Sequence, residues 1–141
     1  MPKKDFEIQI EISSEQDVFI SSLKVLKIAE IIGFDKVSRY AISTAVSELA
    51  RNIYKYAQKG KITAYQLNMA NDKGIEIIAE DKGPGITDIS NAMKDNFSTG
   101  NSLGLGLPGV KRIMDEFDIE TKHNQGTRIT VRKWMMKNGR S

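Results

Sequence analysis

The chain has 141 residues, of which 40% are hydrophobic and 28% charged, a composition ordinary for one soluble domain spanning 1–141. The net charge of +3 is modest, and the basic residues are not interleaved with stacking aromatic side chains, which argues against nucleic-acid binding. The absence of cysteine excludes disulfides and thiolate chemistry, and there is neither a signal-peptide pattern nor an apolar run of the ~18–20 residues that a membrane span needs, so we expect a cytoplasmic protein.

The first part of the chain predicts one strand and two helices. Residues 5–12 alternate between apolar and polar side chains, which is the period of a half-buried strand. Ser13 and Ser14 offer an N-cap to a run of apolar residues at helical spacing, and Gly33 is a typical stop signal. A second helix is predicted from about Asp35 to Ala57.

The middle of the chain predicts a hairpin and a glycine-rich loop. Alternating runs at 61–70 and 75–80 are separated by Asn71-Asp72-Lys73-Gly74, whose residue types tolerate positive φ in a tight turn. The loop Asp81-Lys82-Gly83-Pro84-Gly85 follows directly. Beyond it the periodicity weakens, and a short helix is predicted over 88–95.

The last part predicts a helix and a second pair of strands. The helix begins near Leu105–Leu107 and continues to Phe117, and strands at 117–122 and 127–134 are joined by a turn. The order of the elements predicts an α+β two-layer sandwich, in which helices cover one face of a mixed, mostly antiparallel sheet of about five strands.

The helix predicted at 35–57 has two unlike faces. At about 100° per residue its apolar residues fall on one arc, while Glu48, Asn52 and Lys55 fall together on nearly the opposite side. Residues in such positions usually meet water. A carboxylate, an amide oxygen and an ammonium group are also the base, the metal ligand and the phosphate counter-charge that phosphoryl transfer needs. We therefore expect this face to meet either solvent or a bound ligand.

Two glycine-rich segments suit a nucleotide. Asp81 at a strand end, with Gly83 and Gly85 close behind, lets backbone approach a flat ligand, and its carboxylate accepts from an exocyclic amine such as that of adenine. A plain turn explains the same residues without a ligand. The second segment, 100–109, leads into a helix with Pro108 in its first turn, where free N–H groups suit phosphate.

Other nucleotide-binding motifs are excluded. The run 104–109 fits the spacing of a dinucleotide-binding fingerprint, but a polar loop precedes it where that motif requires a strand, and the surrounding strands read as antiparallel. The chain has no Walker motif and neither the HRD nor the DFG motif of protein kinases.

Taken in order, these segments resemble the Bergerat-fold (GHKL) ATP-binding family, which includes gyrase B, sensor histidine kinases and a mismatch-repair ATPase. Glu48–Asn52 resembles its N box, Asp81–Gly85 and Gly104–Gly106 its two glycine boxes, and Gly126-Thr127 its final adenine-contacting pair. Within this family the likeness is strongest to the serine/threonine switch kinases of the bacterial stressosome. It rests on five runs: 47–57, 80–86, 97–99, 107–117 and 132–134.

The resemblance implies roles for individual residues, with ATP and Mg²⁺ as cofactors. Glu48 would be the general base toward a substrate hydroxyl, Asn52 would bind Mg²⁺ and Lys55 would lie near the phosphates. Asp81 would bind the adenine amine, and residues 86–103 would form a lid over the nucleotide. The remaining nucleotide contacts would come from Gly83, Gly85, Ile86, Thr99, Gly104, Leu105, Gly106, Leu107 and Thr127.

The resemblance also implies partners. Substrates would be serine or threonine residues of STAS-domain scaffold proteins, and the released kinase would then activate a PP2C-type phosphatase. The oligomeric state is left open between monomer and homodimer. Histidine kinases usually have Asn where Glu48 stands and carry a separate domain with a phospho-accepting His, whereas this chain has only His123. The acceptor is therefore expected on another protein.

Two alternatives remain within the same fold. An anti-sigma factor kinase would phosphorylate an anti-anti-sigma STAS protein and sequester a sigma factor. A non-catalytic adaptor would bind ATP only as a conformational ligand, and Glu48 argues against it.

Overall fold

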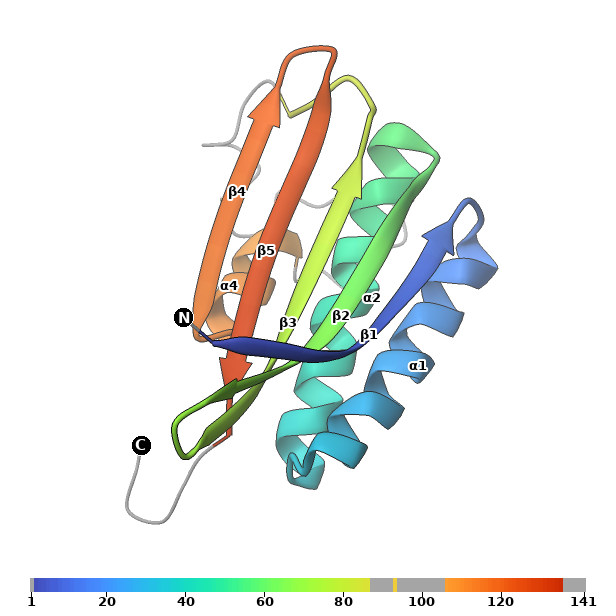
Figure 1. Cartoon of the computed structure of the whole chain (residues 1–141). Helices are drawn as coiled ribbons and strands as arrows, with labels where there is room; N and C mark the ends of the chain where they lie inside the picture. Colours follow the sequence, from blue (N-terminus) through green and yellow to red (C-terminus); the bar gives the residue numbers. More distant parts are fainter. Residues whose placement is uncertain (1, 87–92, 94–105, 136–141) are drawn as a thin grey trace.

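The computed structural model describes residues 2–86, 93 and 106–135, and these form a layer of strands backed by helices (Figure 1). The short helix predicted at 88–95, apart from residue 93, lies outside the described residues, as do Thr99, Gly104 and Leu105. In chain order the elements are β1 (Lys3–Ile12), α1 (Glu15–Ile32), α2 (Lys36–Ala57), β2 (Gly60–Met69), β3 (Asp72–Asp81), α4 (Gly106–Ile113), β4 (Glu116–Lys122) and β5 (Gly126–Trp134).

The five strands form one sheet in the order β1-β2-β3-β5-β4. Each neighbouring pair of described strands is antiparallel, so the sheet contains no parallel pair among them. The two-layer fold of five strands predicted from the sequence is confirmed, but the described strands form a wholly antiparallel sheet and not the mixed one expected. The order also places β3 and β5 side by side at the centre, which brings the end of β3 against the start of β5.

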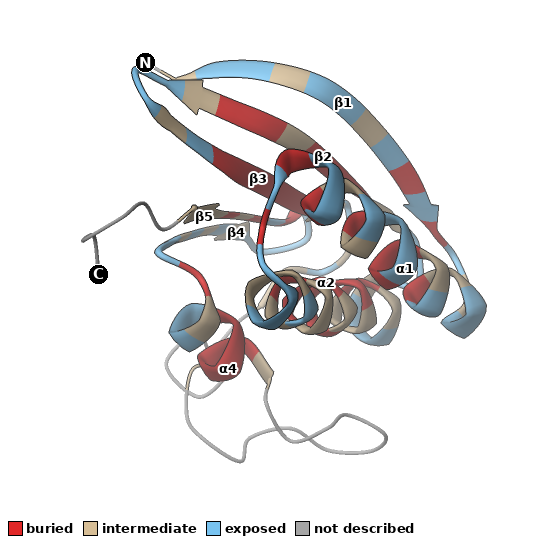
Figure 2. Ribbon diagram, turned by 90° about the horizontal axis from the view of Figure 1, so that it is seen from below, coloured by how far each residue is buried: buried red, intermediate tan, exposed pale blue. Residues whose placement is uncertain are grey.

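The helices lie on one side of the sheet, and the core fills the space between the layers (Figure 2). Alternate residues of the strands supply one half of this core, and the apolar arc of α2 supplies much of the other. The largest fully buried aliphatic side chains are those of Ile12, Ile42, Leu49, Ile62, Leu67, Ile75, Ile77, Val25, Val46, Val110 and Val131. None of the helices in the described part of the chain is long and apolar enough to cross a bilayer.

The ends of the two long helices follow the predicted signals. Ser14 Oγ accepts a hydrogen bond from the Asp17 amide at 3.1 Å, and Gly33 ends α1 in the left-handed region with φ 118°. Asp35 caps α2 by accepting from the Ser38 amide at 2.7 Å, and this hydrogen bond lowers the pKa of its carboxyl. Fixing the start of α2 sets the direction in which each later residue of that helix points.

Two predicted boundaries are wrong. The turn expected at 71–74 is a two-residue turn at Ala70 and Asn71, with Ala70 at φ 53°. Gly74 instead lies inside β3, where a Cβ would come within 2.8 Å of the Trp134 ring, so this glycine is required by packing. The helix expected to reach Phe117 ends at Ile113, because the Asp115 amide donates to the Arg132 carbonyl and the chain joins the sheet as β4.

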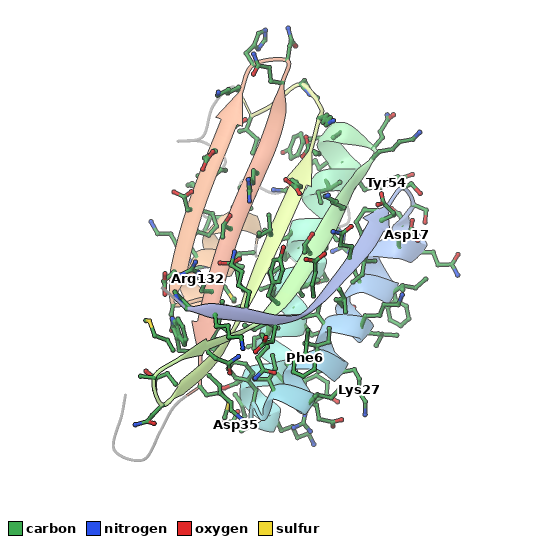
Figure 3. All side chains as sticks on the ribbon, viewed as in Figure 1. Phe6, Asp17, Lys27, Asp35, Tyr54 and Arg132 are labelled. Carbon is green, nitrogen blue, oxygen red and sulfur yellow. The ribbon has the colours of Figure 1, made fainter. Side chains whose placement is uncertain are left out.

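A buried ion pair lies on the sheet face that carries no helix. Glu76 alternates with the core residues of β3, and its side chain is 1% exposed. Arg132, labelled in Figure 3, donates from Nε to Glu76 Oε2 at 2.7 Å. Lys4 Nζ lies 2.8 Å from Oε1 in ion-pair rather than hydrogen-bond geometry. These contacts attach the start of β1 and the end of β5 to the central strand.

Replacing Arg132 with alanine is expected to lower the free energy of unfolding by about 3 kcal/mol, because Glu76 then keeps only Lys4 as a partner for its buried charge. Urea denaturation measures the change. The matched control is Arg128→Ala, whose guanidinium reaches Glu80 only at 4.0 Å and is half exposed, so its loss should cost less than about 1 kcal/mol. Equal denaturation midpoints for the two variants would contradict this account.

Candidate nucleotide-binding site

A pocket forms where the C-terminal half of α2 faces the end of β3 and the start of β5. It brings together four residues that the sequence analysis assigned to nucleotide: Asn52, Asp81, Ile86 and Thr127. The described lining residues are Leu49, Asn52, Ile53, Tyr56, Ala79, Asp81, Ile86, Thr127 and Ile129. One polar edge on an otherwise largely apolar wall suits a flat heterocycle with an exocyclic amine.

The pocket is narrow in this structure. Its volume is ≈ 10 Å³, far below the several hundred Å³ that ligand pockets hold. A larger hollow of ≈ 610 Å³ lies beside the same strand ends, but it is lined mainly by charged side chains such as Glu11, Lys61 and Arg128 and contains no residue of α2. We assign the site to the narrow pocket, because it joins α2 to the strand ends among the described residues. A nucleotide would need a wider pocket than this to bind here.

Asp81 is the last residue of β3 and is held by its neighbours. Its Oδ1 accepts from the Gly83 amide at 2.8 Å. Partial burial raises the pKa of its carboxyl, and hydrogen bonds from the backbones of Gly83 and Thr127 oppose that rise. An ionised acceptor in a half-buried position can form a stronger hydrogen bond to an amine than it could in water.

The glycines around Asp81 are explained by close packing. A Cβ at Gly83 would lie 2.5 Å from the Ala57 Cβ, at the end of α2. Gly126 has φ 116°, and a Cβ there would overlap the Asp81 carbonyl oxygen. Because these two glycines let three elements meet at one point, they position Asp81 whether or not they also touch a ligand. Their contact with adenine stays a prediction.

Thr121 belongs to the site, although the sequence analysis did not single it out. It lies opposite Thr127 in the β4–β5 pair, and their hydroxyl oxygens are 3.0 Å apart. Its Oγ1 also accepts from the Ile86 amide at 2.8 Å. Thr121 thus ties the loop after β3 to the floor of the pocket. The strand register is the signal that links Thr121 to the site. In the sequence alone, a threonine in an alternating strand does not stand out.

Glu48 does not face solvent, which was one of the two environments expected for it. The residue is 4% exposed, although it lies nearly opposite the apolar arc of α2. Among the described elements, α2 is contacted by the sheet, by α1 and by α4. Within the part of the chain that the structure describes, Glu48 Oε1 has no hydrogen-bond partner, and Arg51 Nη1 lies 3.8 Å from it. Asn52, one turn further, is half buried and lines the pocket.

Four other predicted residues lie outside the pocket lining: Lys55, Gly85, Gly106 and Leu107. Lys55 is exposed, with Nζ 5.3 Å from the centre of the Tyr56 ring. Gly106 begins α4 in the left-handed region, with φ 55°. Leu107 is 3% exposed and belongs to the hydrophobic core, so its side chain anchors α4 to that core. Their roles toward the nucleotide stay predictions.

The site has no metal cluster of protein ligands. Among the described residues, no group of three or more His, Cys, Asp or Glu side chains could hold a cation. The amide of Asn52 is one of the oxygen-bearing side chains in the pocket lining. This fits Mg²⁺, which is commonly bound by one or two protein oxygens together with phosphates and water.

Several known proteins are similar in sequence to this chain over most of its length. Residues 21–133 match the model of the histidine kinase-like ATPase domain. The chain is 48% identical over 126 residues to the serine/threonine-protein kinase RsbT of Bacillus subtilis (strain 168), covering 89% of this chain and 95% of that protein. It is also similar to the anti-sigma F factor of Caldanaerobacter subterraneus subsp. tengcongensis, at 35% identity over 103 residues, covering 69% of this chain and 71% of that protein. The anti-sigma F factor of Thermoanaerobacter sp. (strain X514) is 36% identical over 100 residues, covering 67% and 68%.

Proposed function

Because the chain belongs to the histidine kinase-like ATPase family, we propose that it is an ATP-dependent serine/threonine protein kinase that phosphorylates a partner protein. The observation that carries this proposal is the position of Glu48. It places a buried carboxylate one helical turn from Asn52, which lines a pocket with Asp81 and Thr127. The amide oxygen of Asn52 and the carboxylate of Asp81 line this pocket, and Glu48 lies outside its lining, one turn of α2 before Asn52.

The proposed chemistry is direct transfer to a hydroxyl. Asp81 accepts from the adenine amine, and Thr127 lies beside it on the pocket floor. Asn52 would hold Mg²⁺, and the ion would supply positive charge toward the phosphates. The acceptor oxygen bonds to the γ-phosphorus, the bond to the bridging oxygen breaks, and ADP leaves with that electron pair. Glu48 takes the hydroxyl proton.

The partners proposed are those of a switch kinase: STAS-domain proteins as substrates and a PP2C-type phosphatase as the target of the released kinase. Support comes from the similarity to RsbT, which reaches 48% identity and 95% of that protein. The anti-sigma F factors match at 35–36% and cover about two-thirds of the chain. An anti-sigma factor kinase is therefore the second candidate.

Transfer from radiolabelled ATP to purified STAS-domain proteins tests the proposal. We expect label on a serine or threonine of the acceptor, in a form stable to acid. Acid-labile label on the kinase's own His123 would overturn it, as would nucleotide-dependent thermal stabilisation without any transfer, which is the behaviour of an adaptor. Affinity purification separates the two kinase classes, since a switch kinase retains a phosphatase and an anti-sigma factor retains a sigma factor.

A further inference from the structure

Glu48 and Arg51 face each other without completing a hydrogen bond. They are three residues apart on α2, with Arg51 Nη1 3.8 Å from Glu48 Oε1. Both atoms are shielded from solvent, and neither has a hydrogen-bond partner in the structure as described. A buried polar atom without a partner raises the free energy of the folded state. Most buried polar atoms in folded proteins have a partner, so this pair calls for an explanation, and a catalytic role is one.

The two side chains differ in their access to solvent. Glu48 is 3% exposed by its side chain and Arg51 34%. The rest of Arg51 lines a groove of ≈ 290 Å³ between α1 and α2, with Phe19, Ser22 and Ser47 among its other walls. Within the described residues, Glu48 is the one carboxylate within 4.0 Å of the guanidinium. Arg51 therefore connects an accessible groove to the buried carboxylate.

The gap between the two atoms is small enough to close. The exposed pair Lys27–Glu30, also three residues apart, already meets at 3.0 Å. A charge-assisted hydrogen bond needs about 2.7–2.9 Å, so a movement of roughly 1 Å at the end of the long Arg51 side chain suffices. Catalytic hydrogen bonds are often long without substrate and shorten in the loaded enzyme.

We propose that Arg51 is a positioning residue for phosphoryl transfer. With the acceptor bound, its guanidinium donates to Glu48 Oε1, fixes the carboxylate and directs Oε2 toward the acceptor hydroxyl, whose proton Oε2 receives. Arg51 acts through Glu48. The inference rests on the proposed function, because it needs Glu48 as the base.

Arg51→Ala is expected to lower kcat for transfer to a STAS-domain acceptor by about 10- to 100-fold, the scale of a misplaced catalytic group, with the KM for ATP unchanged. Arg51→Lys keeps the cation and should recover part of the loss. Arg39→Ala is the matched control, since it removes an α2 arginine that pairs with Glu30 at 3.9 Å, and it should keep the wild-type kcat.

A double-mutant cycle separates positioning from a structural role. In a Glu48→Gln background, adding Arg51→Ala should cause little further loss, because the carboxylate that it orients is gone. Fully additive losses, or a wild-type kcat for Arg51→Ala, would overturn the role of Arg51 while leaving the kinase assignment intact. No transfer by the wild-type protein to any hydroxyl acceptor would overturn both.

Discussion

Replacing Glu48 with alanine is expected to lower phosphoryl transfer by more than about 100-fold while ATP still binds. The magnitude is that of a lost general base. ATP affinity should be kept because Glu48 is not among the residues that line the pocket. Single-turnover transfer to the acceptor protein measures the first effect, and nucleotide titration by calorimetry measures the second.

Two comparisons make this result specific. Glu30→Ala removes an exposed carboxylate from α1 and should leave transfer unchanged. Glu48→Gln keeps the shape of the buried side chain, so an equal loss of transfer would assign the effect to the carboxylate rather than to a cavity. If Glu48→Ala transferred phosphate at the wild-type rate, another group would have to be the base.

Replacing Asp81 with asparagine should weaken ATP binding by about 100-fold. An amide group can present its N–H₂ donor to the adenine amine, and a donor facing a donor leaves both unpaired, at a cost of roughly 1–3 kcal/mol. Isothermal titration with ATP measures this loss. GTP has a carbonyl where adenine has its amine, so the variant should discriminate less between the two nucleotides. Unchanged ATP affinity would remove Asp81 from the site.

The same variant tests the environment of the carboxyl. Burial raises the pKa of Asp81 above its ordinary value of 3.8, so folding favours the protonated form. The resulting stabilisation is fully present below pH 3.8 and is lost as pH rises through the raised pKa. Relative to Asp81→Asn, the wild type should lose stability across that interval and then stay constant. If the difference in unfolding free energy between the wild type and Asp81→Asn did not vary with pH, the raised pKa of Asp81 would be contradicted.

The sequence predicted those features that local patterns encode. Alternation located the strands, and the Ser13-Ser14 pair located the start of the first long helix, which Ser14 caps. The second helix was expected from about Asp35, which is its N-cap. The family resemblance is confirmed by the match over 21–133. Asp81 could be placed at a strand end because the periodic run before it stops there.

Features that depend on contacts between distant segments were missed. A helical projection gives the direction of Glu48 relative to its own helix, but it does not show that other elements crowd that side. Gly74 reads as a turn residue unless Trp134 is known to pack over it. Thr121 becomes visible only when the register pairs it with Thr127.

The narrowness of the adenine pocket has a thermodynamic consequence. If only a fraction of molecules is wide enough at any moment to admit a nucleotide, the measured dissociation constant equals the intrinsic one divided by that fraction. Substitutions that touch no ligand can then tighten or weaken ATP affinity by changing how often the cleft opens. A partner protein that prefers the open form would, by the same linkage, raise the affinity for ATP.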